Sequence, residues 1–168
     1  MPNLYLAGMM GAGKSVTGRA LAALMSYGFV DLDSEIEKKE GRPITAIFSS
    51  EGEPYFRDVE TRVLREFSLK ERQVVSTGGG IVLRDENVEQ MRRTGKVIFL
   101  EASLPVLWER VCQNKNRPLL NTPDPKGSLE RILKGREKRY KATCDFSVMT
   151  DGLSPESVAR QIMGHLKQ

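Results

Sequence analysis

Residues 8–15 of the chain read GMMGAGKS and match the pattern G-x-x-x-x-G-K-[ST]. Glycines allow such a stretch to turn so that several backbone N–H groups point at one anion. Lys14 can reach the β- and γ-phosphates of a nucleotide, and the Ser15 hydroxyl can ligate Mg²⁺. An apolar segment precedes the loop and an amphipathic segment follows it. The pattern therefore predicts a site for a nucleoside triphosphate rather than a plain glycine turn.

Two carboxylates, Asp31 and Asp33, follow the next apolar segment. Alternate residues of a strand share a face, so we expect both side chains on one face at the end of a strand. Strand ends are where open α/β sheets bind ligands. One carboxylate could hold Mg²⁺, directly or through water, and the other could accept a proton from an attacking hydroxyl. The alternative is that Asp33 only caps the helix that follows.

Arg57 lies in the segment FSSEGEPYFRDVE (48–60), close to the carboxylates of Asp58 and Glu60. An arginine held by a neighbouring carboxylate is positioned to bind a substrate carboxylate with two hydrogen bonds. A salt bridge on the surface of a helix is the alternative. Three glycines, 78–80, follow a further strand segment, where they allow a ligand to approach the backbone closely. A flexible loop is the alternative there.

Basic residues mark the last third of the chain. Arg117 belongs to a proline-rich stretch, NKNRPLLNTPDPKGS (114–128), which is typical of a functional or mobile connection. On a mobile flap, Arg117 could close over the phosphates and stabilise the charge on a transferred group. A disordered surface segment is the alternative. Spacing alone does not choose among the arginines of the next helical segment, which are Arg131, Arg136 and Arg139.

Short apolar runs alternate with longer amphipathic stretches. The apolar runs predict strands at 3–7, 73–76, 96–101 and 146–150, with a shorter fifth strand within 27–33. The amphipathic stretches predict helices at 15–26, 34–40, 44–50, 54–69, 85–93, 104–113, 128–141 and 155–167. Strands separated by helices favour a parallel sheet with helices on both faces. The length, 168 residues, suits one domain.

Composition argues against several other classes of protein. No apolar run reaches the roughly 18 residues of a membrane helix, and the first residues lack a signal-peptide pattern. Cys112, Cys144 and the single histidine, His165, have no zinc-binding spacing, so we expect reduced thiols and a surface histidine in a cytosolic protein. The net charge of +4 suits small anionic substrates, nucleic acid, a membrane surface or solubility alone.

An incomplete guanine-selecting motif and the length of the chain narrow the class of reaction that the phosphate loop serves. A guanine-selecting N-K-x-D pattern is only partly matched by NKNR at 114–117. The chain is also too short to hold both a motor ATPase core and a partner domain. A small kinase fits the length best.

Together these motifs resemble those of shikimate kinase. The resemblance runs from GMMGAGKS through DLD, GRPITAIFSSEGEPYFRDVE, STGGG and NRPLL to REKRY, nearly the whole chain. The middle block separates this family from adenylate and gluconate kinases, which share the phosphate loop. The resemblance implies an α/β P-loop kinase fold: a three-layer α/β/α sandwich whose five-stranded parallel sheet has the order 2-3-1-4-5. It also implies one shikimate kinase domain, 1–168, with a substrate-binding region over about 31–60 and a lid over about 112–125.

The activity that the resemblance implies is ATP-dependent phosphorylation of the 3-hydroxyl of shikimate. The products would be shikimate 3-phosphate and ADP, on the way to chorismate and the aromatic amino acids. The implied cofactor is Mg²⁺, and the implied partners are the small molecules ATP and shikimate. The resemblance implies no nucleic-acid or membrane partner, a monomer, and a cytoplasmic location.

The family's site residues transfer onto matching positions of this chain. The implied catalytic residues are Asp33, the leading candidate for the base, with Lys14 and Arg117. The implied ATP-binding residues are Gly11, Ala12, Gly13, Lys14, Ser15, Val16, Arg110, Arg117 and Pro155. The implied shikimate-binding residues are Asp33, Phe48, Phe56, Arg57, Gly78, Gly79, Gly80 and Arg136. The implied metal site is formed by Ser15, with Asp31 acting through water.

The resemblance also implies finer roles for several of these residues. Arg57 and Arg136 would bind the carboxylate of shikimate, and Glu60 would brace Arg57. The adenine would lie between Arg110 and the turn near Pro155.

The chain departs from the family pattern in two places. Val16 stands where many members have threonine, which changes only a side-chain contact. Pro54 and Tyr55 border the Phe-Arg pair at the edge of the acceptor site.

Two other functions stay open beside the one that the resemblance implies. The first is a kinase of a different small hydroxy acid, such as gluconate. The second is a nucleotide-binding module without phosphoryl transfer, whose basic helix at 129–141 binds nucleic acid or a partner. That helix lacks the interleaved aromatic residues on which bases stack.

Overall fold

The structure, a computed structural model, describes residues 2–167. Within them one parallel sheet is formed by β1 (Asn3–Ala7), β2 (Gly28–Asp31), β3 (Gln73–Ser76), β4 (Gly95–Glu101) and β5 (Phe146–Met149). The spatial order β2-β3-β1-β4-β5 confirms the predicted order. Parallel strands that are covered on both faces must be apolar along their length. The central strand β1 accordingly pairs with both β3 and β4 and is buried at every position.

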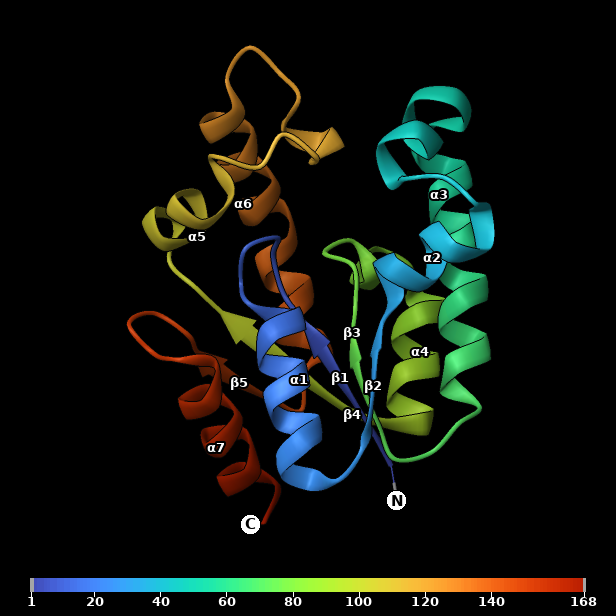
Figure 1. Cartoon of the computed structure of the whole chain (residues 1–168). Coiled ribbons are helices and arrows are strands. Elements are labelled where there is room, and N and C mark those ends of the chain that lie inside the picture. Colours follow the sequence, from blue (N-terminus) through green and yellow to red (C-terminus); the bar gives the residue numbers. More distant parts are fainter. Residues whose placement is uncertain (1, 168) are drawn as a thin grey trace.

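Helices cover both faces of this sheet (Figure 1). They are α1 (Lys14–Met25), α2 (Leu32–Glu40), α3 (Ile44–Ser68), α4 (Asp85–Thr94), α5 (Leu104–Val111), α6 (Pro125–Thr143) and α7 (Pro155–Leu166), with the 3₁₀ turns η1 (Ile81–Leu83) and η2 (Pro118–Leu120). Helices α1 and α7 pack together on one face, and α3, α4 and α6 lie on the other, which gives the predicted three layers. No helix within residues 2–167 is long and apolar enough to cross a membrane.

The end of β2 differs from the prediction in a way that bears on function. The strand stops at Asp31, and Asp33 lies in the first turn of α2, so the expectation that both carboxylates share one face of a strand is wrong. Asp31 is the residue that caps α2, because its Oδ1 accepts a hydrogen bond from the Ser34 N–H at 3.2 Å. This cap lets α2 begin two residues earlier than the predicted range and leaves the Asp33 carboxylate free for another role.

Two further boundaries have local causes. Helix α3 consists of two helical pieces joined at Gly52, whose φ of 82° and ψ of 173° are not helical. This break confirms the separate predictions at 44–50 and 54–69, and Pro54 stands in the first turn of the second piece, where its missing N–H costs nothing. Helix α6 begins at Pro125, ahead of the predicted start at 128, because the Asp124 side chain accepts a hydrogen bond from the Gly127 N–H at 3.0 Å.

Candidate active site

The phosphate loop joins the end of β1 to the start of α1. Gly11 and Gly13 have φ values of 82° and 87°, a left-handed conformation that side chains disfavour. Gly13 immediately precedes α1, so the turn directs the helix N-terminus at the loop, where its free N–H groups attract anions. The Lys14 ammonium lies along the loop and donates to the carbonyl oxygens of Gly8 at 2.8 Å and Met9 at 2.9 Å.

The electrostatic surroundings of Lys14 are those of an anion site. The pKa of the Lys14 ammonium is lowered to about 8, chiefly by burial; the charges of Arg117 and Arg136 act in the same direction, and those of Asp33 and Asp31 oppose the change. Within residues 2–167 Lys14 has no ion pair with a carboxylate. An anion bound at the loop would therefore restore the charged form of this lysine.

Oxygen atoms from two neighbouring strands gather beside the loop. The Ser15 hydroxyl donates to Asp31 Oδ2, and the Ser76 Oγ lies 3.2 Å from the Ser15 Oγ. Asp31 and Ser76 meet because they are paired residues at the ends of β2 and β3. Hydroxyl and carboxylate oxygens are ligands that Mg²⁺ prefers. Ser76 was not predicted from the sequence, although its place at a strand end, two residues before the glycines 78–80, was a signal.

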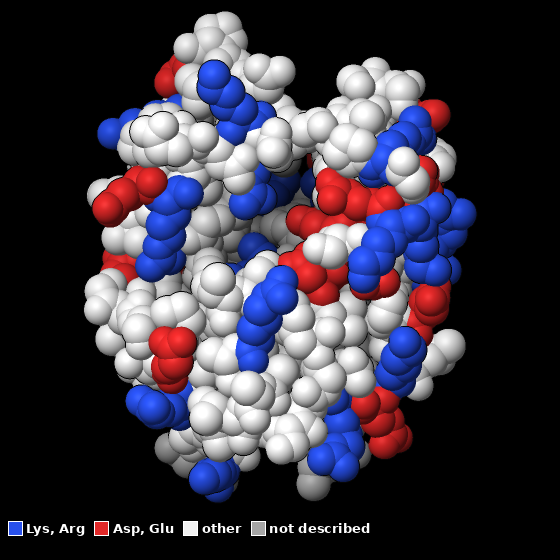
Figure 2. Space-filling model, in the orientation of Figure 1, with Lys and Arg blue, Asp and Glu red and all other residues white. Residues whose placement is uncertain are grey.

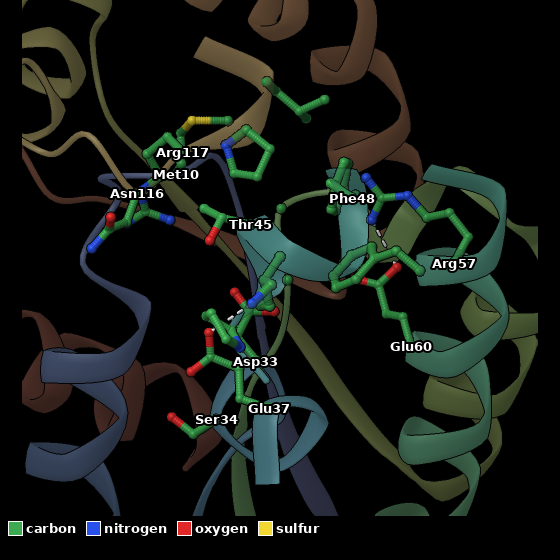
Figure 3. Close-up of a pocket in the computed structure, with 18 of the residues that line it drawn as sticks. Met10, Asp33, Ser34, Glu37, Thr45, Phe48, Arg57, Glu60, Asn116 and Arg117 are labelled. Atoms are coloured by element: carbon green, nitrogen blue, oxygen red, sulfur yellow. Dashed lines mark hydrogen bonds and ion pairs between the residues drawn. The ribbon is translucent and has the colours of Figure 1, made fainter. Parts of the chain in front are cut away.

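An acceptor cavity of about 510 Å³ opens between the phosphate loop, α2, α3, the segment 116–119 and Arg136 of α6. All the residues predicted to contact shikimate line it, namely Asp33, Phe48, Phe56, Arg57, Gly78, Gly79, Gly80 and Arg136. Figure 3 shows Arg57 and Glu60 on one side of this cavity and Met10, Asn116 and Arg117 on the other. Residues that the sequence analysis missed also line it, including Met10, Thr45, Asn116 and Leu119. All four lie inside motifs quoted above, at positions to which the motifs assign no contact.

A second cavity of about 320 Å³ lies over the phosphate loop and is lined by Lys14, Ser15 and Asp31. It shares Met10, Asp33 and Arg117 with the acceptor cavity. These three residues therefore stand where a ligand in one cavity would meet a ligand in the other.

A third cavity, of about 200 Å³, continues the second one between Arg110 and Pro155. Figure 2 shows the cleft from outside, with basic side chains in its depth and acidic side chains along the wall on the α2 and α3 side. The cleft thus offers positive charge where phosphates would lie.

Arg57 is held by two carboxylates. Its Nη1 donates to Glu60 Oε2 at 2.8 Å, and its Nη2 donates to Glu53 Oε1 at 3.0 Å. Arg57 is only 7% exposed and Glu60 is fully buried, so the alternative of a surface salt bridge is wrong. Asp58 instead points away and pairs with Arg84 at 2.7 Å. Glu53 was missed in the sequence analysis, although its i, i+4 spacing from Arg57 was a signal.

Arg136 is the arginine of α6 that faces the acceptor cavity. It is 7% exposed and has no ion-pair partner within residues 2–167. The Arg131 side chain is 68% exposed, and Arg139 is bound elsewhere, to the carbonyl of Val82 and the carboxylate of Asp85. A buried cation without a carboxylate partner is costly, and an anionic ligand would offset that cost.

Asp33 has the surroundings of a proton acceptor. Its Oδ1 is buried and has no hydrogen-bond partner. Burial, and then the charge of Asp31, raise the pKa of the Asp33 carboxyl, and Lys14 and Arg117 oppose this change. A raised pKa makes a carboxylate a stronger base, and the free oxygen is available to a ligand. The Nε of Arg117 is likewise buried without a partner.

Residues excluded by the sequence analysis lie away from the cleft. His165 is exposed on α7, where its ring stacks on Phe146 at a centroid distance of 4.9 Å. Cys112 is exposed, Cys144 is half-buried, and both are free thiols. Among residues 2–167, no histidine or cysteine lines the acceptor cavity or the cavity over the phosphate loop.

Comparisons with known proteins agree with this geometry. The family model described as shikimate kinase matches residues 10–167. The shikimate kinase of Thermodesulfovibrio yellowstonii is 42% identical over 97% of this chain and 94% of its own. Among solved structures, the shikimate kinase of Acinetobacter baumannii in complex with shikimate has a TM-score of 0.97 at 37% identity, covering 99% of this chain and 93% of the other. The shikimate kinase of Aquifex aeolicus has a TM-score of 0.86 at 36% identity, covering 98% and 96%. With the family model matched over nearly its whole length, this chain belongs to the shikimate kinase family.

Proposed function

We propose that this protein transfers the γ-phosphoryl group of ATP to the 3-hydroxyl of shikimate, giving shikimate 3-phosphate and ADP. The observation that carries the proposal is that Asp33 and Arg117 line both the acceptor cavity and the second cavity, over the phosphate loop. A terminal phosphate in one cavity and a ring hydroxyl in the other would meet beside these two side chains. Family membership supports the same reaction, as does the similarity to a relative that was solved in complex with shikimate.

The nucleotide would bind along the phosphate loop. The backbone of residues 11–16 would hold its phosphates, and the adenine would lie between Arg110 and the turn near Pro155, which share a cavity. Ser15 and Asp31 fit Mg²⁺, because their oxygens already lie together, and Ser76 could add a hydroxyl. Bound there, Mg²⁺ would neutralise phosphate charge.

The acceptor would be oriented by charged side chains from separate elements. Arg57 and Arg136 would bind its carboxylate, since the first is braced by Glu60 and the second has no ion pair of its own. Phe48 and Phe56, whose rings lie 4.8 Å apart, would form an apolar wall against the ring of the acceptor. The glycines at 78–80 would let the ring approach the backbone.

Asp33 would act at the reacting hydroxyl. Its free Oδ1 would accept the hydroxyl hydrogen bond, hold the oxygen in line with the γ-phosphorus and receive the proton. Lys14 and Arg117 would stabilise the negative charge spread over the moving phosphoryl group. Closure of a lid over about 112–125 would bring Arg117 to the phosphates and exclude water. Most of the rate enhancement then comes from positioning and electrostatics.

The decisive experiment measures ADP production at saturating Mg·ATP with and without shikimate, next to a panel of acceptors that includes gluconate. We expect ADP release that depends on shikimate. Release with gluconate and not with shikimate would favour the kinase of another hydroxy acid. No release with any acceptor, together with a salt-dependent gel shift, would favour a nucleic-acid-binding module.

Two wider properties belong to the same proposal. We infer that the protein works as a single-domain monomer in the cytoplasm, as the family resemblance implies. Sedimentation equilibrium tests the first point: a mass near the chain mass of 18.8 kDa supports a monomer, and twice that mass contradicts it.

A further inference from the structure

Helix α6 contacts the glycine segment 78–80 through a tyrosine that the reaction scheme leaves unused. The Tyr140 hydroxyl donates to the carbonyl oxygen of Gly79. Tyr140 is fully buried, and its ring stacks on Phe99 of β4 at a centroid distance of 4.9 Å and an interplanar angle of 18°. Because the ring is fixed against the sheet, the hydroxyl is a rigid anchor for the Gly79 peptide.

The Gly79 peptide lies between the two halves of the cleft. A Cβ atom placed on Gly79 would stand 3.5 Å from both the Arg136 Nη1 and the Met10 backbone nitrogen. Arg136 precedes Tyr140 by one helical turn, so both side chains leave the same face of α6. One hydroxyl therefore stands beside both a predicted carboxylate-binding side chain and a predicted substrate-binding backbone.

The orientation of the Gly79 carbonyl has a consequence for the next residue. In a planar trans peptide the C=O and the following N–H point in opposite directions. A hydrogen bond that directs the Gly79 carbonyl at α6 therefore turns the Gly80 N–H away from α6. That N–H donates no hydrogen bond within residues 2–167, and Gly80 lines the acceptor cavity beside Arg57. Tyr140 thus leaves a donor available to a ligand.

The phenol keeps its proton under ordinary conditions. Burial raises the pKa of the Tyr140 hydroxyl to about 12, while the charge of Arg136 and a side-chain hydrogen bond with it act in the opposite direction. The hydroxyl donates to Gly79 and has a lone pair left for the Arg136 guanidinium.

A second contact fixes the same segment farther along. Arg139 Nε donates to the Val82 carbonyl at 2.5 Å, and its Nη2 pairs with Asp85 at 2.6 Å. Since this anchor holds η1 independently, loss of the Tyr140 hydroxyl should loosen the glycines and Arg136 without detaching the whole segment.

We propose that Tyr140 is a positioning residue for the acceptor substrate: its hydroxyl fixes the Gly79 peptide and the Arg136 guanidinium in the arrangement that receives a carboxylated ring alcohol. The inference rests on the proposed function, because shikimate is the ligand whose binding it describes. It assigns Tyr140 an effect on acceptor affinity and none on the nucleotide.

Tyr140→Phe tests the role, because it removes one oxygen atom and keeps the ring stacked on Phe99. Calorimetry should give a Kd for shikimate raised about five- to tenfold, with a matching rise in KM for shikimate, as expected for one lost hydrogen bond. The Kd for ADP and the KM for ATP should stay at wild-type values. If Tyr140 had only a structural role, its loss would not weaken the binding of shikimate while leaving the binding of the nucleotide unchanged.

Tyr5→Phe is the matched control. Tyr5 is also fully buried, and its hydroxyl lies 2.6 Å from the Thr94 Oγ1, at the end of the sheet away from the cleft. Both variants should lower the melting temperature, and only Tyr140→Phe should raise the Kd for shikimate. An equal rise in the control would overturn the inference, as would wild-type shikimate affinity in Tyr140→Phe.

A second variant covers the case in which Tyr140→Phe does not fold. Phe99→Leu keeps the hydroxyl but loosens the ring that carries it, so the Kd for shikimate should rise by a smaller factor. Unchanged affinity in this variant would contradict the proposed anchoring. If the wild-type protein neither binds nor phosphorylates shikimate, the proposed function fails and this inference fails with it. If the wild type is active and both Tyr140→Phe and Phe99→Leu bind shikimate with wild-type affinity, only the inference about Tyr140 fails.

Discussion

The two sides of the cleft are built in different ways. The nucleotide side is mostly backbone: residues 8–15 supply a turned loop and a helix N-terminus from one continuous stretch. The acceptor side is made of side chains on separate elements, with Asp33 on α2, Arg57 on α3 and Arg136 on α6. A backbone site tolerates changes of side chain, whereas the acceptor site depends on individual charged groups. Single substitutions on the acceptor side should therefore weaken acceptor binding or turnover while leaving the affinity for the nucleotide unchanged.

Asp33→Asn should show this difference between the two sides most sharply. Asparagine keeps the shape but cannot take the proton, so we expect kcat to fall by about 10²- to 10⁴-fold. The Kd for ADP should stay near wild type, because the phosphate loop is untouched. Glu35→Gln, on the same helix with its carboxylate paired to Lys38 rather than directed into the cleft, is the control and should be fully active. Near-normal turnover in Asp33→Asn would remove Asp33 from catalysis.

The pH profile of the wild type gives an independent measure of Asp33. Burial raises the pKa of this carboxyl, and the carboxylate is the active form. The value of kcat/KM for shikimate should therefore fall as the pH drops through the raised pKa, at a higher pH than an exposed aspartate would give. An acid limb at the ordinary pKa of aspartate would contradict the buried position of this group.

Arg136→Ala should raise the Kd for shikimate by about 10- to 100-fold, because a hydrogen bond to a charged group is lost. Calorimetry measures this effect directly. Arg131→Ala is the matched control, since Arg131 lies on the same helix with its side chain 68% exposed, and its affinity should not change. Equal affinities in the two variants would mean that the substrate carboxylate does not reach Arg136.

The nucleotide side has its own pH dependence, carried by Lys14. Its pKa of about 8 means that the free protein loses this charge as the pH rises through 8. If bound phosphates keep the lysine charged, ATP affinity should fall about tenfold between pH 7 and pH 9, with proton uptake on binding near pH 8. Lys14→Arg stays charged over this range and should show a flat profile. A flat profile in the wild type would contradict the lowered pKa.

The same contrast explains what the sequence could predict. The phosphate loop, the strand positions and the two pieces of α3 follow from local signals: a motif, apolar runs and a glycine break. The order of the strands in the sheet was implied only by the family resemblance. The position of Asp33 was predicted wrongly, because β2 was expected to continue to residue 33. The strand instead ends at Asp31, whose side chain caps α2 by accepting a hydrogen bond from the Ser34 N–H. Local spacing also left Arg131, Arg136 and Arg139 equivalent.

Long-range packing supplies what the sequence left open. Of those three arginines, only Arg136 faces the acceptor cavity. The family resemblance was needed to choose it, because the spacing of the helix did not. Ser76 meets Asp31 only because β2 and β3 are neighbours. Contacts between distant segments have no signature in the spacing of one segment, so the acceptor side was the harder half to predict.

Glu53 offers the smallest and most specific test of the acceptor side. It binds Arg57 through Nη2 at 3.0 Å, yet its side chain is 42% exposed, whereas Glu60 holds the other end of the guanidinium from a buried position. A substrate carboxylate would have to compete with Glu53 for this donor. Glu53→Gln should therefore lower the KM for shikimate, by no more than about threefold, since exposed ion pairs contribute little. Glu51→Gln, whose partner is Arg42, should leave the KM unchanged. A raised KM in Glu53→Gln would instead mean that Glu53, like Glu60, positions Arg57.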